Sequence, residues 1–260
     1  MVQENAGLGA DWFHTGRARP DAACRLYVFH HAGGSAATYA RWAQMLPADV
    51  EVAAVQLPGR QNRRSTPAFT DLDTLVEAVY EALEDDLDGR RFAFFGHSMG
   101  ALIAYRLTLA LQKDGAPAPA LLAVSAWEGS AHRPSPVPVA HLSDEEFLAR
   151  VGEFGGLPPE VTGNRELLDL VLPTLRADFT VVNGYTDDGA RVGCPVVAYG
   201  GASDPLLGGG AMGAWADRAD AFQGLSELPG GHFYLYEQAM ALAADLSRRL
   251  RRSAAGPQRG

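Results

Sequence analysis

The sequence has few of the residues that would indicate an extracellular disulfide framework or a structural metal centre. It contains 2 cysteines among 260 residues, Cys24 and Cys194, and both lie in apolar runs typical of strands. Isolated cysteines in such runs are most often buried thiols, so we expect neither a disulfide nor a metal site. We expect no cofactor-binding residues either.

Basic residues and long apolar runs are also scarce. Lys113 is the only lysine, and the formal net charge is −9. Binding to nucleic acid needs a basic surface, so this function class is excluded. No run approaches the roughly 20 apolar residues of a membrane-spanning helix. The N-terminus lacks a basic segment followed by an apolar one, so no signal peptide is predicted and we expect a cytoplasmic protein.

What the sequence does contain is an alternation of short apolar, β-rich runs with segments of helical spacing. Such alternation predicts an α/β fold with a mostly parallel sheet and helices on both faces. The predicted strands are 24–31, 50–59, 91–96, 119–127, 194–200 and 224–230. The predicted helices are 36–47, 73–87, 98–113, a stretch around Trp215, and 233–252.

One long segment, from residue 128 to about 190, interrupts this alternation because it contains no convincing strand. Ser143 followed by Glu146 predicts a capped helix over 143–154, and 164–185 reads as two helices meeting at Pro173. We therefore expect one domain over 1–260 with a helical lid inserted between two strands. The last residues, 253–260, have the composition of a disordered tail.

The motif GHSMG, residues 96–100, lies between a predicted strand and a predicted helix. It fits the pattern G-x-S-x-G, in which a sharp turn exposes the serine above the sheet and at the start of a helix. Side chains at Gly96 and Gly100 would collide with backbone in so tight a turn. The motif in this context predicts Ser98 as a catalytic nucleophile.

A serine hydroxyl needs a base, and in this type of fold the chain order is nucleophile, acid, histidine. His232, in LPGGHF, is the histidine that follows the last predicted strand. Asp204, in GGASDP, is the favoured acid, with Glu128 as the alternative one strand earlier. The backbone N–H groups of Met99 and of Ala32, in the loop HHAGGSA, are the candidate oxyanion donors.

Several of these motifs together resemble the type II thioesterases that accompany polyketide and nonribosomal peptide synthetases. The resemblance rests on FHHAGGSA, LPGRQNR, GHSMGA, LPTLRADF and the pair SDP…GGHF, and it runs from about residue 12 to 250. It implies an α/β-hydrolase fold with a mobile lid. It also implies the roles of Ser98, Asp204 and His232 as catalytic residues and of Met99 and Ala32 as oxyanion donors. His30 is a departure, because relatives often have proline there.

The implied reaction is hydrolysis of acyl groups from the phosphopantetheine thiol of acyl or peptidyl carrier proteins, without metal or cofactor. Another serine esterase, a cyclising product-release thioesterase and a non-catalytic binding protein are the alternatives. We expect a monomer. Carrier proteins are usually acidic, so docking on this acidic chain would need a local patch. The candidate patches are Arg60, Arg63 and Arg64, or Arg133 and Arg176.

Overall fold

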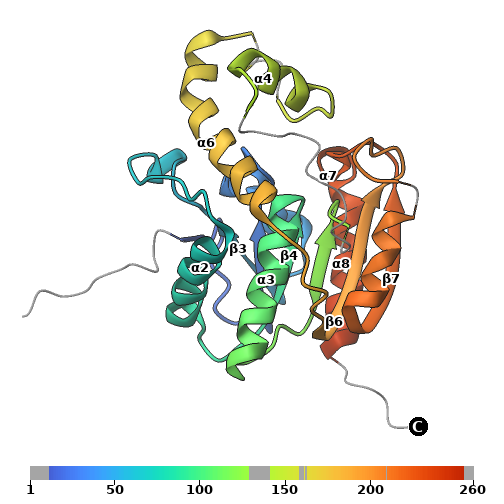
Figure 1. Cartoon of the computed structure of the whole chain (residues 1–260). Helices are drawn as coiled ribbons and strands as arrows, with labels where there is room; N and C mark the ends of the chain where they lie inside the picture. Colours follow the sequence, from blue (N-terminus) through green and yellow to red (C-terminus); the bar gives the residue numbers. More distant parts are fainter. Residues whose placement is uncertain (1–11, 129–140, 158–160, 162, 209, 255–260) are drawn as a thin grey trace, which may run out of the picture.

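The fold of the chain was described from a computed structural model (Figure 1). The structure describes residues 12–128, 141–157, 161, 163–208 and 210–254. Arg133, one of the candidate docking residues, lies outside them.

A seven-stranded sheet in the order β1-β3-β2-β4-β5-β6-β7 forms the centre of the molecule. Its strands are β1 (Phe13–His14), β2 (Cys24–Phe29), β3 (Val50–Val55), β4 (Arg91–His97), β5 (Leu122–Ser125), β6 (Val192–Gly201) and β7 (Ala219–Leu228). All neighbouring pairs are parallel except β1 with β3. The predicted mostly parallel sheet is confirmed, and the short edge strand β1 was not expected from the sequence.

Side chains alternate between the two faces of the central strands and build one hydrophobic core on each. In β4, Phe92 and Phe94 enter the core beneath α2 and α3, whereas Ala93 and Phe95 enter the core beneath α1 and α8. Because both faces are covered, these strands are apolar along their whole length rather than at every second residue. Figure 1 shows α2 and α3 together on one side of the sheet and α8 on the other.

The helices follow the predicted segments closely. They are α1 (Trp42–Met45), α2 (Leu72–Asp86), α3 (Met99–Asp114), α4 (Asp144–Gly152), α6 (Arg165–Gly184), α7 (Tyr234–Glu237) and α8 (Ala239–Ala254), with 3₁₀ turns η1 (Ala36–Tyr39), η2 (Gln61–Arg63) and η4 (Ala211–Arg218). The helix expected over 36–47 is thus a 3₁₀ turn and one short α-helical turn. The final helix is divided into α7 and α8, and α8 includes the first two residues of the expected tail.

The segment between β5 and β6 contains helices, as expected, but differs from the prediction at Pro173. Ser143 and Glu146 form a complete capping box at the start of α4. Pro173 lies inside a single helix, α6, and does not divide it. Leu175 and Phe179, which follow the proline, pack with Phe147 of α4 in a small apolar cluster. This packing compensates for the backbone hydrogen bond that proline cannot make.

Among the described residues, no helix has the length and apolarity needed to cross a lipid bilayer. The two cysteines are buried free thiols.

Candidate active site

Ser98 occupies a strained bend between β4 and α3. Its backbone lies at φ 55° and ψ −120°, a region that residues with a side chain rarely adopt. The Ser98 N–H donates to the carbonyl of Ser125 at the end of the neighbouring strand, 2.8 Å away, which holds the bend against β5. Strain of this kind persists where surrounding structure enforces it. Ser98 itself is partly exposed.

The two glycines of the motif are required by close backbone contacts. A Cβ on Gly96 would lie 2.1 Å from the carbonyl oxygen of Gly100, and a Cβ on Gly100 would lie 2.2 Å from that of Phe29. Both separations are far shorter than van der Waals contact. The absence of side chains therefore lets α3 start directly against the ends of β2 and β4.

We expect Gly100→Ala to destabilise the fold by about 1–3 kcal/mol or more, because the added methyl group forces backbone apart. Gly152→Ala is the matched control, since a Cβ there has no described atom within 4 Å and alanine favours the helix. Urea unfolding of both variants measures the difference. Equal stabilities of the two variants would show that the bend tolerates a side chain.

His232 and Asp204 lie beside Ser98, although they are far from it in sequence. Nε2 of His232 is 3.1 Å from Oγ of Ser98, and Nδ1 is 2.8 Å from Oδ2 of Asp204. An ionised carboxylate can only accept hydrogen bonds, so Nδ1 carries the proton and donates it to Asp204. Nε2 is then left to accept the proton of the Ser98 hydroxyl. The sequence left Asp204 and Glu128 open as partners of His232, and the contact is made by Asp204.

The loops that carry the acid and the histidine touch each other through glycine. A Cβ on Gly201, at the end of β6, would lie 2.2 Å from the carbonyl oxygen of Gly231. The N–H of Ser203 also donates to the carbonyl of Gly230, 2.9 Å away. These contacts bring Asp204 and His232 to the carboxyl ends of β6 and β7, at the same edge of the sheet as Ser98.

The two candidate oxyanion donors come from the start of α3 and from the loop after β2. Met99 is the first residue of α3, and the N–H groups of a first helical turn have no acceptor within the helix. Ala32 follows β2, the strand that pairs with β4 through Phe29 and Gly96. The turn from His31 to Gly34 is closed by the Gly34 N–H, which donates to the His31 carbonyl at 2.9 Å.

Two further histidines surround His232 and are held neutral. The rings of His31 and His97 have their centroids 6.1 Å apart, and the ring of His97 lies 5.3 Å from that of His232. Burial lowers the pKa of His31 to about 4 and holds the pKa of His97 well below its usual range. His31 also hydrogen-bonds the hydroxyl of Tyr236, a contact that the sequence did not indicate.

The arginines considered for docking are largely engaged within the protein. Arg60 is buried and forms an ion pair with Asp178. Arg176 pairs with Asp144, and Arg63 lies over the ring of Trp12. Arg60 therefore cannot belong to a surface patch, because its guanidinium is enclosed.

Comparisons with known proteins find similarity over nearly the whole chain. Residues 24–250 match the family model described as thioesterase domain. The chain is 37% identical to linear gramicidin dehydrogenase LgrE of Brevibacillus parabrevis, with 90% of each protein covered. It is 35% identical to thioesterase PikA5 of Streptomyces venezuelae, over 91% of this chain and 84% of PikA5. The solved structure of the type II thioesterase BorB, from the borrelidin biosynthetic cluster, is 34% identical with a TM-score of 0.82, and covers 92% of this chain and 97% of BorB.

Proposed function

Because the chain belongs to the thioesterase family and has its α/β-hydrolase fold, we propose that it is an editing thioesterase. It hydrolyses acyl groups from the phosphopantetheine thiol of acyl or peptidyl carrier proteins. The observation that carries the proposal is His232, which lies within hydrogen-bonding distance of both Ser98 and Asp204. This arrangement suits nucleophilic attack on a carbonyl carbon.

In the first half of the reaction, Ser98 takes the acyl group. His232 Nε2 accepts the hydroxyl proton as Oγ bonds to the thioester carbonyl carbon. The carbonyl oxygen becomes an oxyanion, which the N–H groups of Met99 and Ala32 stabilise; such a donor is worth about 3–4 kcal/mol. The C–S bond then breaks, and the leaving sulfur takes the proton from His232.

In the second half, water releases the acyl group as a free acid. His232 accepts a proton from water while the water oxygen bonds to the acyl carbon. The same two N–H groups hold the second oxyanion. The bond to Ser98 Oγ breaks, and His232 returns the proton to that oxygen, which restores the enzyme. Asp204 stabilises the imidazolium in both halves, since its carboxylate accepts from Nδ1–H.

The inserted helices form the lid that we propose contacts the acyl chain. The ring of Phe154, just after α4, lies 5.8 Å from the ring of His232 and 6.3 Å from that of Phe179 in α6. One apolar side chain of the insertion, that of Phe154, thus reaches His232, and such an apolar lining suits an alkyl substituent on the thioester.

The partner in this proposal is a carrier domain of a polyketide or peptide assembly line. The solved relative BorB, a type II thioesterase, comes from the borrelidin biosynthetic cluster. We propose that the enzyme works in the cytoplasm as a monomer. With a net charge of −9, it docks by local contacts and not by overall attraction to an acidic carrier.

The test is incubation with a panel of acylated carrier proteins, acyl-coenzyme A and a simple ester, with products identified by mass spectrometry. We expect free acid from carrier-bound substrates at higher kcat/KM than from the simple ester, and none with Ser98→Ala. A preference for the simple ester would favour a general esterase, and a cyclic product a release enzyme.

A further inference from the structure

Arg60, which the sequence offered as a candidate docking residue, instead makes a buried ion pair beside the active site. Arg60 and Asp178 are only 8% and 3% exposed. Nη1 and Nη2 of Arg60 lie 2.7 Å from Oδ2 and Oδ1 of Asp178, so the contact is bidentate. The two residues are 118 positions apart, Arg60 in the loop after β3 and Asp178 in α6.

Both partners also bind the turn that carries the candidate oxyanion donor. The Gly33 N–H donates to Oδ2 of Asp178 at 2.7 Å. Nη1 of Arg60 donates to the Gly34 carbonyl at 3.1 Å. One carboxylate and one guanidinium therefore fix the second half of the turn from His31 to Gly34.

The first half of the same turn is fixed by its own backbone and by the preceding residue, His30. The His31 carbonyl accepts from the Gly34 N–H and lies 2.8 Å from Nδ1 of His30. A peptide group is planar, so the Ala32 N–H points opposite to the His31 carbonyl. The direction of the Ala32 N–H thus depends on the closed turn, and the turn depends on its contacts with Asp178 and Arg60.

The helix that supplies Asp178 packs directly on both loops. Oγ1 of Thr174 donates to the Gly59 carbonyl at 2.7 Å. Gly33, at φ +74°, lies so close to α6 that a Cβ there would be 2.7 Å from Cδ1 of Leu175. The part of α6 that follows Pro173 is therefore anchored on the loops that border Ser98.

We propose that the Arg60–Asp178 ion pair is a positioning device that orients the Ala32 N–H toward the oxyanion and links this orientation to α6. The inference rests on the proposed acyl-transfer function. Neither residue is proposed to touch the substrate. They act through the turn, by holding its Gly33 N–H and its Gly34 carbonyl in place.

The test variant is Asp178→Asn, which keeps the shape of the side chain but removes its charge. Loss of one well-aligned oxyanion donor costs about 10²–10³ in kcat. We expect kcat on a small acyl thioester to fall by about 10- to 100-fold, with KM changed by less than about threefold, because misalignment weakens rather than removes the donor. Labelling of Ser98 by a fluorophosphonate should slow in parallel, because its P=O oxygen uses the same N–H groups.

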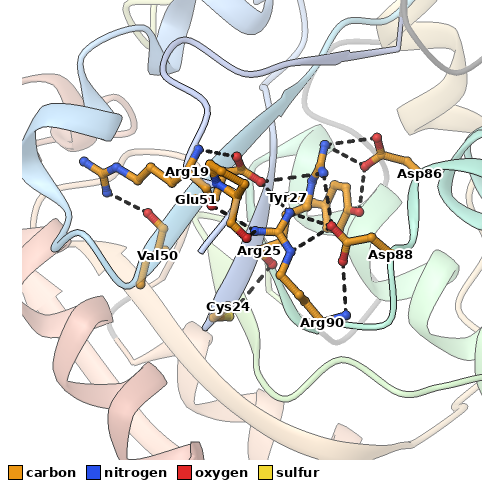
Figure 2. A network of polar contacts seen from close by, with 10 residues as sticks. Arg19, Cys24, Arg25, Tyr27, Val50, Glu51, Asp86, Asp88 and Arg90 are labelled. Atoms are coloured by element: carbon orange, nitrogen blue, oxygen red, sulfur yellow. Dashed lines mark hydrogen bonds and ion pairs between the residues drawn. The ribbon is translucent and has the colours of Figure 1, made fainter. Parts of the chain in front are cut away.

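The matched control is Glu51→Gln, which removes another buried carboxylate that is paired with arginine. Figure 2 shows its network, in which Glu51 pairs with Arg90 at 2.8 Å. Glu51 is 4% exposed and is the second residue of β3, at the opposite end of the strand from the loops of the active site. A purely structural role for Asp178 predicts that both variants lower Tm and leave kcat unchanged.

The result that overturns the proposal is a folded Asp178→Asn enzyme with kcat and labelling rate within twofold of wild type. If this variant does not fold, Arg60→Lys replaces it, because lysine keeps the charge but not the paired donors; unchanged kcat in folded Arg60→Lys is equally contradictory. The small thioester separates this test from the proposed function. An enzyme that cleaves it but ignores acyl-carrier proteins refutes the carrier specificity alone.

Discussion

Replacing Ser98 with alanine is expected to reduce kcat/KM for thioester hydrolysis by about 10⁵-fold, because no acyl-enzyme can form. The remaining groups could only polarise the carbonyl and orient water. Release of the free thiol, followed with a chromogenic disulfide, measures the rate. The hydroxyl of Ser98 bonds His232 but fills no part of the core, so the melting temperature should change little.

Two further substitutions test which carboxylate is the catalytic acid. Asp204→Asn should lower kcat by about 10⁴-fold, because an amide donates to Nδ1 and favours the wrong histidine tautomer. Glu128→Gln is the matched carboxylate change at the other candidate position and should leave kcat within about twofold. Ser98→Ala activity within tenfold of wild type would place the nucleophile elsewhere. A large effect of Glu128→Gln would assign the acid to β5.

The features that the sequence predicted are those that local chain geometry imposes. Gly96 and Gly100 are needed because backbone lies within 2.2 Å of where a Cβ would stand. The spacing that creates this requirement is visible in five consecutive residues. His232 could be chosen because it is the histidine that follows the last predicted strand.

The features that the sequence did not reveal depend on contacts between distant segments. Nothing near Arg60 indicates that Asp178, 118 residues later, will enclose its guanidinium. Pro173 suggested a break between two helices, but packing of Leu175 and Phe179 keeps α6 continuous. In both cases the structure is determined by packing against another element of the fold. The residue pattern within one segment gives no information about that packing.

Acid is expected to destabilise this protein between pH 6.5 and 5, above the range in which most carboxylates titrate. Burial lowers the pKa of His31 to about 4 and holds the pKa values of His30 and His97 well below their usual range. In the unfolded chain each has a pKa near 6.5. The unfolded state therefore binds more protons in this interval, and stability falls as pH falls.

The expected loss of stability is large because all three histidines contribute to it in the same direction. At pH 5 the contribution of His31, whose pKa is lowered to about 4, is about 2 kcal/mol smaller than at pH 8, and His30 and His97 lose stability in the same direction. Domains of this kind have total stabilities of about 5–15 kcal/mol. The aspartates whose pKa values are lowered, such as Asp88 and Asp245, lose their contribution only below about pH 4. The interval between pH 6.5 and 5 therefore reports mainly the histidines.

Urea unfolding at several pH values tests the prediction, and His30→Asn shows which groups cause it. Nδ1 of His30 lies 2.8 Å from the His31 carbonyl, which can only accept. The buried Nε2 of His30 has no hydrogen-bond partner among the residues that the structure describes. Asparagine can donate to the same carbonyl but gains no proton, so the slope of stability against pH should decrease by about 1.4 kcal/mol per pH unit. His14→Asn, at an exposed position, should leave the slope unchanged.

A stability that is constant from pH 7 to 5 in the wild type would mean that the buried imidazoles accept protons without unfolding.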